Sequence, residues 1–159
     1  MKLLKENYLF FIIIISLFSI DRLSKNKIII LLEDQRNLFI NDYLNFNLVF
    51  NTGIGFGFFS LDAGLYYNLL SFFISLIILV LIFIMLKSKH IEKCFFSLII
   101  GGALGNLYDR IIFKAVPDFI DFHYLDFHWF SFNIADIFIS LGIIFMLINE
   151  FVFNKKNEN

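Results

Sequence analysis

The sequence predicts an α-helical integral membrane protein with four transmembrane helices and a small extracytoplasmic β-sheet between the first and second helices. Hydrophobic residues make up 59% of the 159-residue chain, and its mean hydropathy is +0.79. That composition is typical of membrane proteins, and the apolar residues gather in four separate segments. We expect a single membrane-embedded domain over residues 1–159, with spans at about 7–25, 63–86, 94–113 and 130–152 and outer segments at about 26–62 and 114–129.

Three of the four predicted spans contain an aspartate at one end. Ala63 to Leu86 is long enough by itself, with 24 uncharged residues against the roughly 20 that a bilayer requires. The other three reach spanning length only by including Asp21, Asp109 or Asp136. If the spans alternate in direction, these acids meet at one membrane face. A charge at bilayer depth costs about 2.5–3.5 kcal/mol on insertion scales, so each is a candidate functional residue.

The distribution of lysine predicts that both termini face the cytoplasm. The other side has six Lys/Arg residues spread over longer segments, together with ten of the fourteen acids. The cytoplasmic side has seven lysines in short segments: Lys2, Lys5, Lys87, Lys89, Lys93, Lys155 and Lys156.

The first outer segment carries signals of extended chain. Apolar residues alternate with asparagine over Leu44–Asn51 with one exception, which predicts a strand. Lys27–Leu32 is the candidate partner strand. The predicted strand leads into the glycine-bearing segment Asn51–Gly57, where another backbone could approach closely.

The second outer segment contains the only proline of the chain. Pro117 favours an extended Val116, so we expect a defined loop around Asp118. Asp118, Asp121 and Asp126 are acids of this segment. Taken one at a time, each is expected to be a solvated surface acid.

Polar and small residues share faces of the third predicted span. Gly102, Asn106 and Asp109 lie on one helical face at spacings of four and three residues. Gly101 and Gly105 form a small-xxx-small pair that lets a neighbouring helix pack closely.

Asn133 and Asp136 also share a helical face, where the amide could orient the carboxylate. Two nearby carboxylates share one proton, and such a pair can activate water and protonate a leaving amine. Asp136 is the natural first member. Spacing alone leaves Asp21, Asp109 and Asp118 open as its partner.

Other chemistries find less support in the sequence. The chain has no His-Glu-x-x-His motif, no Gly-x-Ser-x-Gly elbow and no phosphate-binding loop. His90, His123 and His128 lack metal-ligand spacing, so we expect interfacial roles for them. The net charge of −1 argues against a nucleic-acid partner, and a single cysteine excludes an intrachain disulfide.

Two alternatives from other functional classes remain at this point. One is a small transporter or proton-relay subunit that uses Asp109 and Asp136. The other is a non-enzymatic scaffold with Gly101 and Gly105 at its helix interface. The acids gather at one face rather than through the membrane depth, which favours chemistry near the surface.

Five segments, in order, resemble the signature blocks of the bacterial lipoprotein signal peptidases, or type II signal peptidases. These are Asp21–Lys25, Asn51–Gly57, Gly101–Arg110, Val116–Phe119 and Phe132–Asp136. The resemblance implies an intramembrane aspartic endopeptidase that uses no metal and no cofactor. It implies cleavage of prolipoproteins on the N-terminal side of a diacylglyceryl-modified cysteine.

The resemblance also implies roles for individual residues. It assigns Asp118 and Asp136 to the catalytic pair, so that Asp109 becomes a scaffold acid paired with Arg110. The supporting residues are Asn51, Gly53, Asn106, Asp109, Arg110 and Asn133, and the structural ones are Asp21, Lys25, Gly102 and Gly105. The sequence departs from the family pattern at Arg22, where Gln is usual, at Gly55, where Ala is common, and at Pro117.

The resemblance further implies a multi-pass protein of the bacterial inner membrane with its active site near the outer face. The expected partners are lipid-modified prolipoproteins and membrane lipid, and we expect a monomer.

Overall fold

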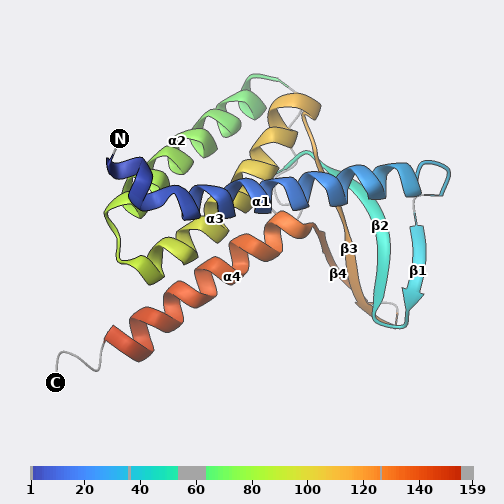
Figure 1. Ribbon diagram of the computed structural model, residues 1–159. Coiled ribbons are helices and arrows are strands. Elements are labelled where there is room, and N and C mark those ends of the chain that lie inside the picture. The colour runs from blue at the N-terminus through green and yellow to red at the C-terminus, as the bar shows by residue number, and fades with distance from the viewer. Residues whose placement is uncertain (1, 36, 54–63, 126, 155–159) are drawn as a thin grey trace.

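The computed structural model describes residues 2–35, 37–53, 64–125 and 127–154 (Figure 1). Over these residues the chain forms a helical bundle with a sheet at the C-terminal end of its first helix. The elements in order are α1 (Lys2–Leu31), β1 (Asn37–Asn41), β2 (Leu44–Asn51), α2 (Leu65–Lys87), α3 (His90–Phe113), β3 (Val116–Tyr124), β4 (Phe127–Phe132), α4 (Ile134–Ile148) and the π-helical segment η1 (Asn149–Asn154).

Four helical stretches in the described part of the chain are long and apolar enough to cross a membrane, which confirms the predicted fold class. They are Glu6–Leu31, Tyr67–Lys87, His90–Phe113 and Ile134–Val152. In the third stretch, 61% of the most apolar window is buried inside the protein, whereas the buried share is 22%, 17% and 11% in the first, second and fourth stretches. The helix α3 is therefore the central helix, and it packs against α1, α2 and α4.

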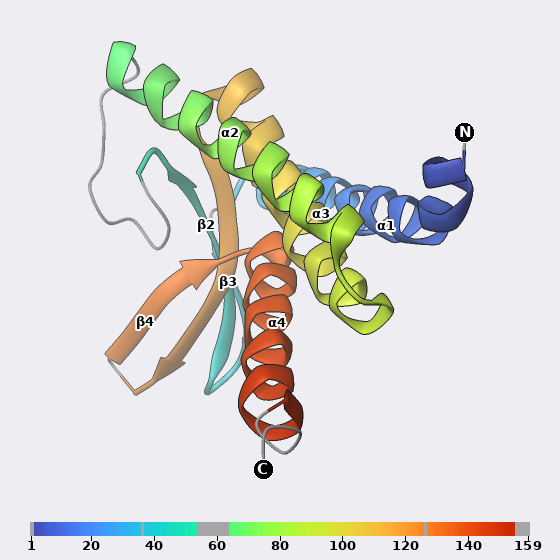
Figure 2. The same cartoon turned by 90° about the vertical axis from the view of Figure 1, so that its left-hand side faces the viewer.

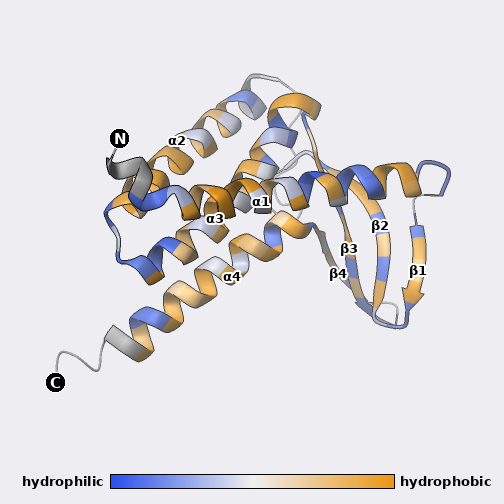
Figure 3. Cartoon of the chain, in the orientation of Figure 1, coloured by the Kyte–Doolittle hydropathy of each residue, from blue (hydrophilic) through white to orange (hydrophobic). Residues whose placement is uncertain are grey.

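The outward faces of the helices are apolar. Figure 3 shows α2 and α4 as mostly hydrophobic, whereas hydrophilic residues interrupt the half of α1 nearest the sheet. Large side chains such as Phe72, Leu79 and Ile143 are exposed on the protein surface. In a membrane this surface faces lipid, where exposed apolar side chains carry no penalty.

The sheet is antiparallel throughout, in the order β1-β2-β3-β4. Its first two strands lie between α1 and α2 in the chain, as predicted, and β2 matches the expected strand. The other two come from the segment between α3 and α4, where the sequence predicts a loop. Figure 2 shows β4 leading into the N-terminal end of α4.

The prediction of a strand at Lys27–Leu32 is wrong, because α1 continues to Leu31. Ile28 and Leu32 are spaced by four residues and pack on one helical side against Leu48 and Phe119 of the sheet. This second apolar core, separate from the core of the helical bundle, fixes the sheet against the end of α1.

The chain turns sharply between α3 and the sheet. Lys114 ends α3 in the left-handed conformation, with φ of 56°. Val116 and Pro117 then begin β3, so Pro117 lies in a strand rather than in the expected loop. Asp118 pairs with Val49 across the sheet, and this pairing gives the carboxylate a rigid backbone support.

Candidate active site

Asp118 and Asp136 are brought together by a single asparagine, Asn133. The Asn133 side-chain amide donates a hydrogen bond to Asp118 Oδ1 at 2.6 Å, and its backbone N–H donates to Asp136 Oδ2 at 3.1 Å. Asp118 comes from β3, while Asn133 and Asp136 come from the start of α4. The long-range pairing of the sheet therefore decides which acid lies next to Asp136.

The Asp118 carboxylate is buried and accepts a hydrogen bond at each oxygen. Besides the bond from Asn133, Asn51 Nδ2 donates to its Oδ2 at 2.8 Å. The Gly53 backbone N–H donates to Asn51 Oδ1 at 2.9 Å, which fixes the orientation of that amide. Burial, and then the nearby charge of Asp136, raise the pKa of Asp118 to about 7, against the lowering effect of the two amide hydrogen bonds.

Asp136 is held in the first turn of α4 by a capping box. The Asn133 side chain accepts a hydrogen bond from the Asp136 backbone N–H at 3.1 Å while the Asp136 carboxylate binds the Asn133 N–H. The helix N-terminus stabilises a negative charge at this position. The helix thus begins later than the span expected at about 130–152, because β4 continues to Phe132, and Asp136 lies near the beginning of α4.

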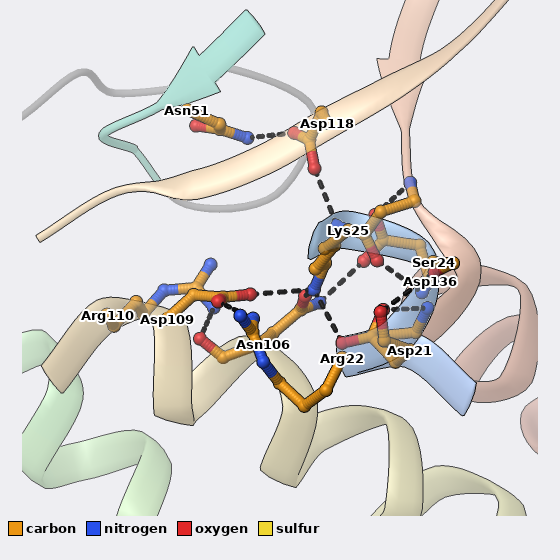
Figure 4. A network of polar contacts seen from close by, with 12 residues as sticks. Asp21, Arg22, Ser24, Lys25, Asn51, Asn106, Asp109, Arg110, Asp118 and Asp136 are labelled. Atoms are coloured by element: carbon orange, nitrogen blue, oxygen red, sulfur yellow. Dashed lines mark hydrogen bonds and ion pairs between the residues drawn. The ribbon is translucent and has the colours of Figure 1, made fainter. Parts of the chain in front are cut away.

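A buried lysine links the remaining acids to the catalytic candidates (Figure 4). Lys25 Nζ lies 2.7 Å from Asp21 Oδ2, 2.8 Å from Asp109 Oδ2 and 2.9 Å from Asn106 Oδ1. Because Lys25 donates to the oxygen of the Asn106 amide, the nitrogen of that amide faces Asp136 Oδ1, at 2.8 Å. Lys25 therefore orients Asp136 through Asn106.

The expected pairing of Asp109 with Arg110 is wrong. The ion pairs of Asp109 are with Lys25 and Arg22, both on α1. Arg110 instead donates to the Asn106 backbone carbonyl at 3.2 Å, and its buried Nε finds no partner among the described residues. Arg22 also stacks over the Tyr108 ring at 4.7 Å. Arg22 thus cross-links α1 to α3.

Two glycines of α3 let the neighbouring helices approach the acids. A Cβ atom at Gly105 would lie 2.4 Å from Asp21 Oδ2, and one at Gly102 would lie 2.4 Å from the Ala135 carbonyl oxygen. The other Asp21 oxygen accepts a hydrogen bond from the Ala135 backbone N–H at 3.0 Å. Asp21 therefore joins α1 to the start of α4, beside Asp136.

An apolar cavity of about 900 Å³ opens beside the paired acids. Phe46, Ile120 and Phe132 of the sheet line it, together with residues of α1 and α4. Asp136 is the acidic residue in its wall. A cavity with this lining can hold an extended apolar group next to a carboxylate.

All twelve residues that are expected at the site from the sequence lie within this region, but the structure differs from other expectations. Asp121 is buried rather than solvated, and it lies against His128. His123 and His128 lack metal-ligand spacing in the sequence, but strand pairing brings both rings close to Asp121. Sequence spacing does not reveal this group, since it depends on the register of β3 and β4. Asp126 and residues 54–57 of the glycine-bearing segment lie outside the described residues.

Solved structures support the fold. Two bacterial membrane enzymes, solved at 2.3 and 1.9 Å resolution, match with TM-scores of 0.79 and 0.73 at 24% and 23% sequence identity. The matches cover 94% and 91% of this chain and 91% and 93% of the solved chains.

Sequence relatives identify the family. The chain matches the signal peptidase (SPase) II family over residues 13–152. It is 48% identical to a lipoprotein signal peptidase of Pelagibacter ubique, with 98% of this chain and 95% of the relative covered. Lipoprotein signal peptidases of Dichelobacter nodosus and Francisella tularensis are 40% and 39% identical, covering 89% and 99% of this chain and 92% and 100% of the relatives. From this match and these identities, the chain belongs to the signal peptidase II family.

Proposed function

We propose that this protein removes signal peptides from prolipoproteins as an aspartic endopeptidase, with Asp118 and Asp136 as the catalytic pair. The observation that carries the proposal is the pair of hydrogen bonds from Asn133, which joins the two carboxylates at a point where Asp136 lies in the wall of the apolar cavity. The names of the relatives support the substrate class. The family assignment does not favour the proton-relay or scaffold alternatives.

The surroundings of the two carboxyl groups support a division of roles within the pair. A pKa raised to about 7 by burial and by the nearby charge of Asp136 favours Asp118 as the carrier of the shared proton and as the general acid. The helix N-terminus and hydrogen bonds from Asn133 and Asn106 favour a negative charge on Asp136. The pair therefore shares one proton, as an acid and a base must for peptide hydrolysis.

The reaction needs only water and the two carboxyl groups. Asp136 accepts a proton from water as the water oxygen bonds to the scissile carbonyl carbon, and Asp118 donates its proton to the carbonyl oxygen. The resulting diol loses the amine when Asp136 returns its proton to the nitrogen and the C–N bond breaks. Asp118 recovers a proton from a diol hydroxyl, which leaves a carboxylic acid and restores the pair.

The cavity supports a lipid-modified substrate. Its lining is almost entirely apolar, and Asp136 lies in its wall. An acyl chain of a diacylglyceryl cysteine, or the apolar helix of a signal peptide, could move from lipid into this space without leaving apolar surroundings. With the modified cysteine bound there, the peptide bond on its N-terminal side would lie next to the acids.

The same proposal includes a topology in the bacterial inner membrane. The N-terminal end of α1 and the C-terminal end of α4 both lie away from the sheet (Figure 1). Lysine density supports a cytoplasmic position for both ends. The paired acids then work near the outer face, where secreted precursors emerge. Reporter fusions to the C-terminus and to the β1–β2 turn would test this orientation.

The test is processing of a lipid-modified precursor by purified variants in detergent micelles. We expect Asp118→Asn and Asp136→Asn each to abolish cleavage, while Asp42→Asn, at an exposed acid in the β1–β2 turn, cleaves normally. Near-normal processing by either of the first two variants would exclude the pair. Equal cleavage of an unlipidated precursor would instead contradict the proposed substrate.

A further inference from the structure

Asp121, His123 and His128 form a cluster on the β3–β4 hairpin that the proposed reaction does not use. One carboxylate oxygen and one ring nitrogen of each histidine all lie within 4.8 Å of one another. His128 Nδ1 is 2.8 Å from Asp121 Oδ2, and the two imidazole rings stack with centroids 5.1 Å apart.

A shift in strand register creates the cluster. Asp121 pairs with Ser131, but two residues later His123 pairs with His128. If the first register continued, Trp129 would lie opposite His123 and His128 would point to the other face of the sheet. The bulge therefore brings a second imidazole, rather than an indole, to the face that carries Asp121. Bulges commonly re-aim side chains in this way.

The cluster contains a polar atom without a hydrogen-bond partner among the described residues, and it is accessible to solvent on one side. The Nδ1 atom of His123 is buried and has no hydrogen-bond partner among the described residues. A buried polar atom without a partner requires an explanation, and a bound ion is one. The Asp121 side chain is 4% exposed while that of His128 is 51% exposed. An ion could thus enter past His128 and reach a sheltered carboxylate.

We propose that Asp121, His123 and His128 bind a divalent transition-metal ion, with Zn²⁺ as the best fit. Two imidazoles and a carboxylate are preferred ligands of Zn²⁺, and water can fill the fourth position. The three ligand atoms lie within 4.8 Å of one another, and side-chain rotation would bring them to the shorter separations that a shared ion requires. The bound ion links β3 to β4 across the hairpin.

This metal site is separate from the catalytic pair. Ile120 and Phe122 line the apolar cavity, so Asp121 and His123, which alternate with them along β3, point to the opposite face of the sheet. Binding of Zn²⁺ and cleavage of a precursor can therefore be measured independently, and either can fail without the other.

The test uses the full chain in detergent micelles, purified without a polyhistidine tag and stripped of metal with EDTA. Zn²⁺ is titrated by calorimetry into the wild type, His123→Phe, His128→Phe and His90→Phe. Phenylalanine keeps an aromatic ring in each strand position while removing the ligand atom. His90 is the matched control, since it lies at the start of α3 and packs against Phe10.

We expect the wild type and His90→Phe to bind one Zn²⁺ per chain. Both strand variants should bind about tenfold or more weakly, since even the loss of a supporting contact at a metal site costs this much. A second measurement needs no variant: Co²⁺ added to the wild type should give visible absorption of a nitrogen-bound ion, which Zn²⁺ then removes. Unchanged binding by both strand variants, or no Zn²⁺ binding by the wild type, would overturn the proposal.

Discussion

Replacing Asp118 by asparagine should abolish proteolysis and, at the same time, make the fold more stable at alkaline pH. The substitution keeps the size of the side chain and removes its charge. Asp118 is 3% exposed, so the ionised carboxylate is held away from water in the folded state. The amide avoids that cost at every pH.

The magnitude follows from the pKa of Asp118, which rises from the ordinary 3.8 to about 7 on folding. A difference of about 3 units at 1.36 kcal/mol each corresponds to about 4 kcal/mol between the ionised and protonated forms. Because the folded pKa is the higher one, the folded state binds the proton more tightly, and this contribution to stability is lost as pH rises toward and through about 7. From pH 5 to pH 8 the wild type should lose about 2–3 kcal/mol relative to Asp118→Asn.

The Asp118→Asn substitution also destabilises the fold slightly, by an amount that does not depend on pH. Asn51 and Asn133 both donate to the Asp118 carboxylate, whereas an asparagine at this position offers one oxygen and one amide nitrogen. One of the two hydrogen bonds is therefore lost, at about 1 kcal/mol. The pH-dependent difference between the two proteins is unaffected by this offset.

The assay is thermal unfolding in detergent micelles at pH 5 and pH 8, followed by the fluorescence of Trp129, the single tryptophan. At about 2–4 °C per kcal/mol, the difference in melting temperature between variant and wild type should change by roughly 5–10 °C across this range. Asp42→Asn is the control and should follow the wild type. Parallel pH profiles for Asp118→Asn and the wild type would refute the reasoning about burial.

Three other substitutions test the supporting contacts by unfolding and by cleavage of a lipid-modified precursor. Lys25→Met should destabilise the fold by about 3–5 kcal/mol, because it leaves the buried Asp21 and Asp109 carboxylates without their shared cation; a loss below about 1 kcal/mol would contradict this. Gly105→Ala should cost about 1–3 kcal/mol, since its methyl group meets Asp21 Oδ2, and an unchanged melting temperature would show that α1 can move away. Asn133→Ala should lower kcat/KM about a hundredfold, because it removes the residue that joins the two carboxylates. Loss of the helix cap should lower the free energy of unfolding by about 1 kcal/mol. Normal turnover by this variant would exclude the bridging role of Asn133.

Features that depend on neighbours in the chain could be predicted well from the sequence. The four spans follow from runs of apolar residues, and β2 follows from its alternating pattern. The contact between Asn133 and Asp136 follows from their spacing at the start of a helix. The prediction failed at Lys27–Leu32, where the same few residues are compatible with a strand or a helix, and packing against the sheet favours the helix.

The spacing of residues in the sequence could not identify which acid pairs with Asp136. Asp21, Asp109 and Asp118 all lie near the same end of the bundle, and the spacing of residues cannot rank them. Motif blocks pointed to Asp118, and the structure gives a physical account of it: β3 pairs with β2 and places Asp118 between Asn51 and Asn133. Asp109 is instead neutralised by Lys25 and Arg22.

The sequence by itself therefore determined that this chain is a four-span membrane protein with acids at one end and a helix-capping asparagine beside one of them. These properties depend on composition and on spacings of three or four residues. Only the tertiary structure decided how Asp118 and Asp136 are held together, which lysine holds the other acids, and how a register shift gathers Asp121 and two histidines. Such contacts join strands and helices far apart in the chain, and their geometry depends on the packing of the whole fold.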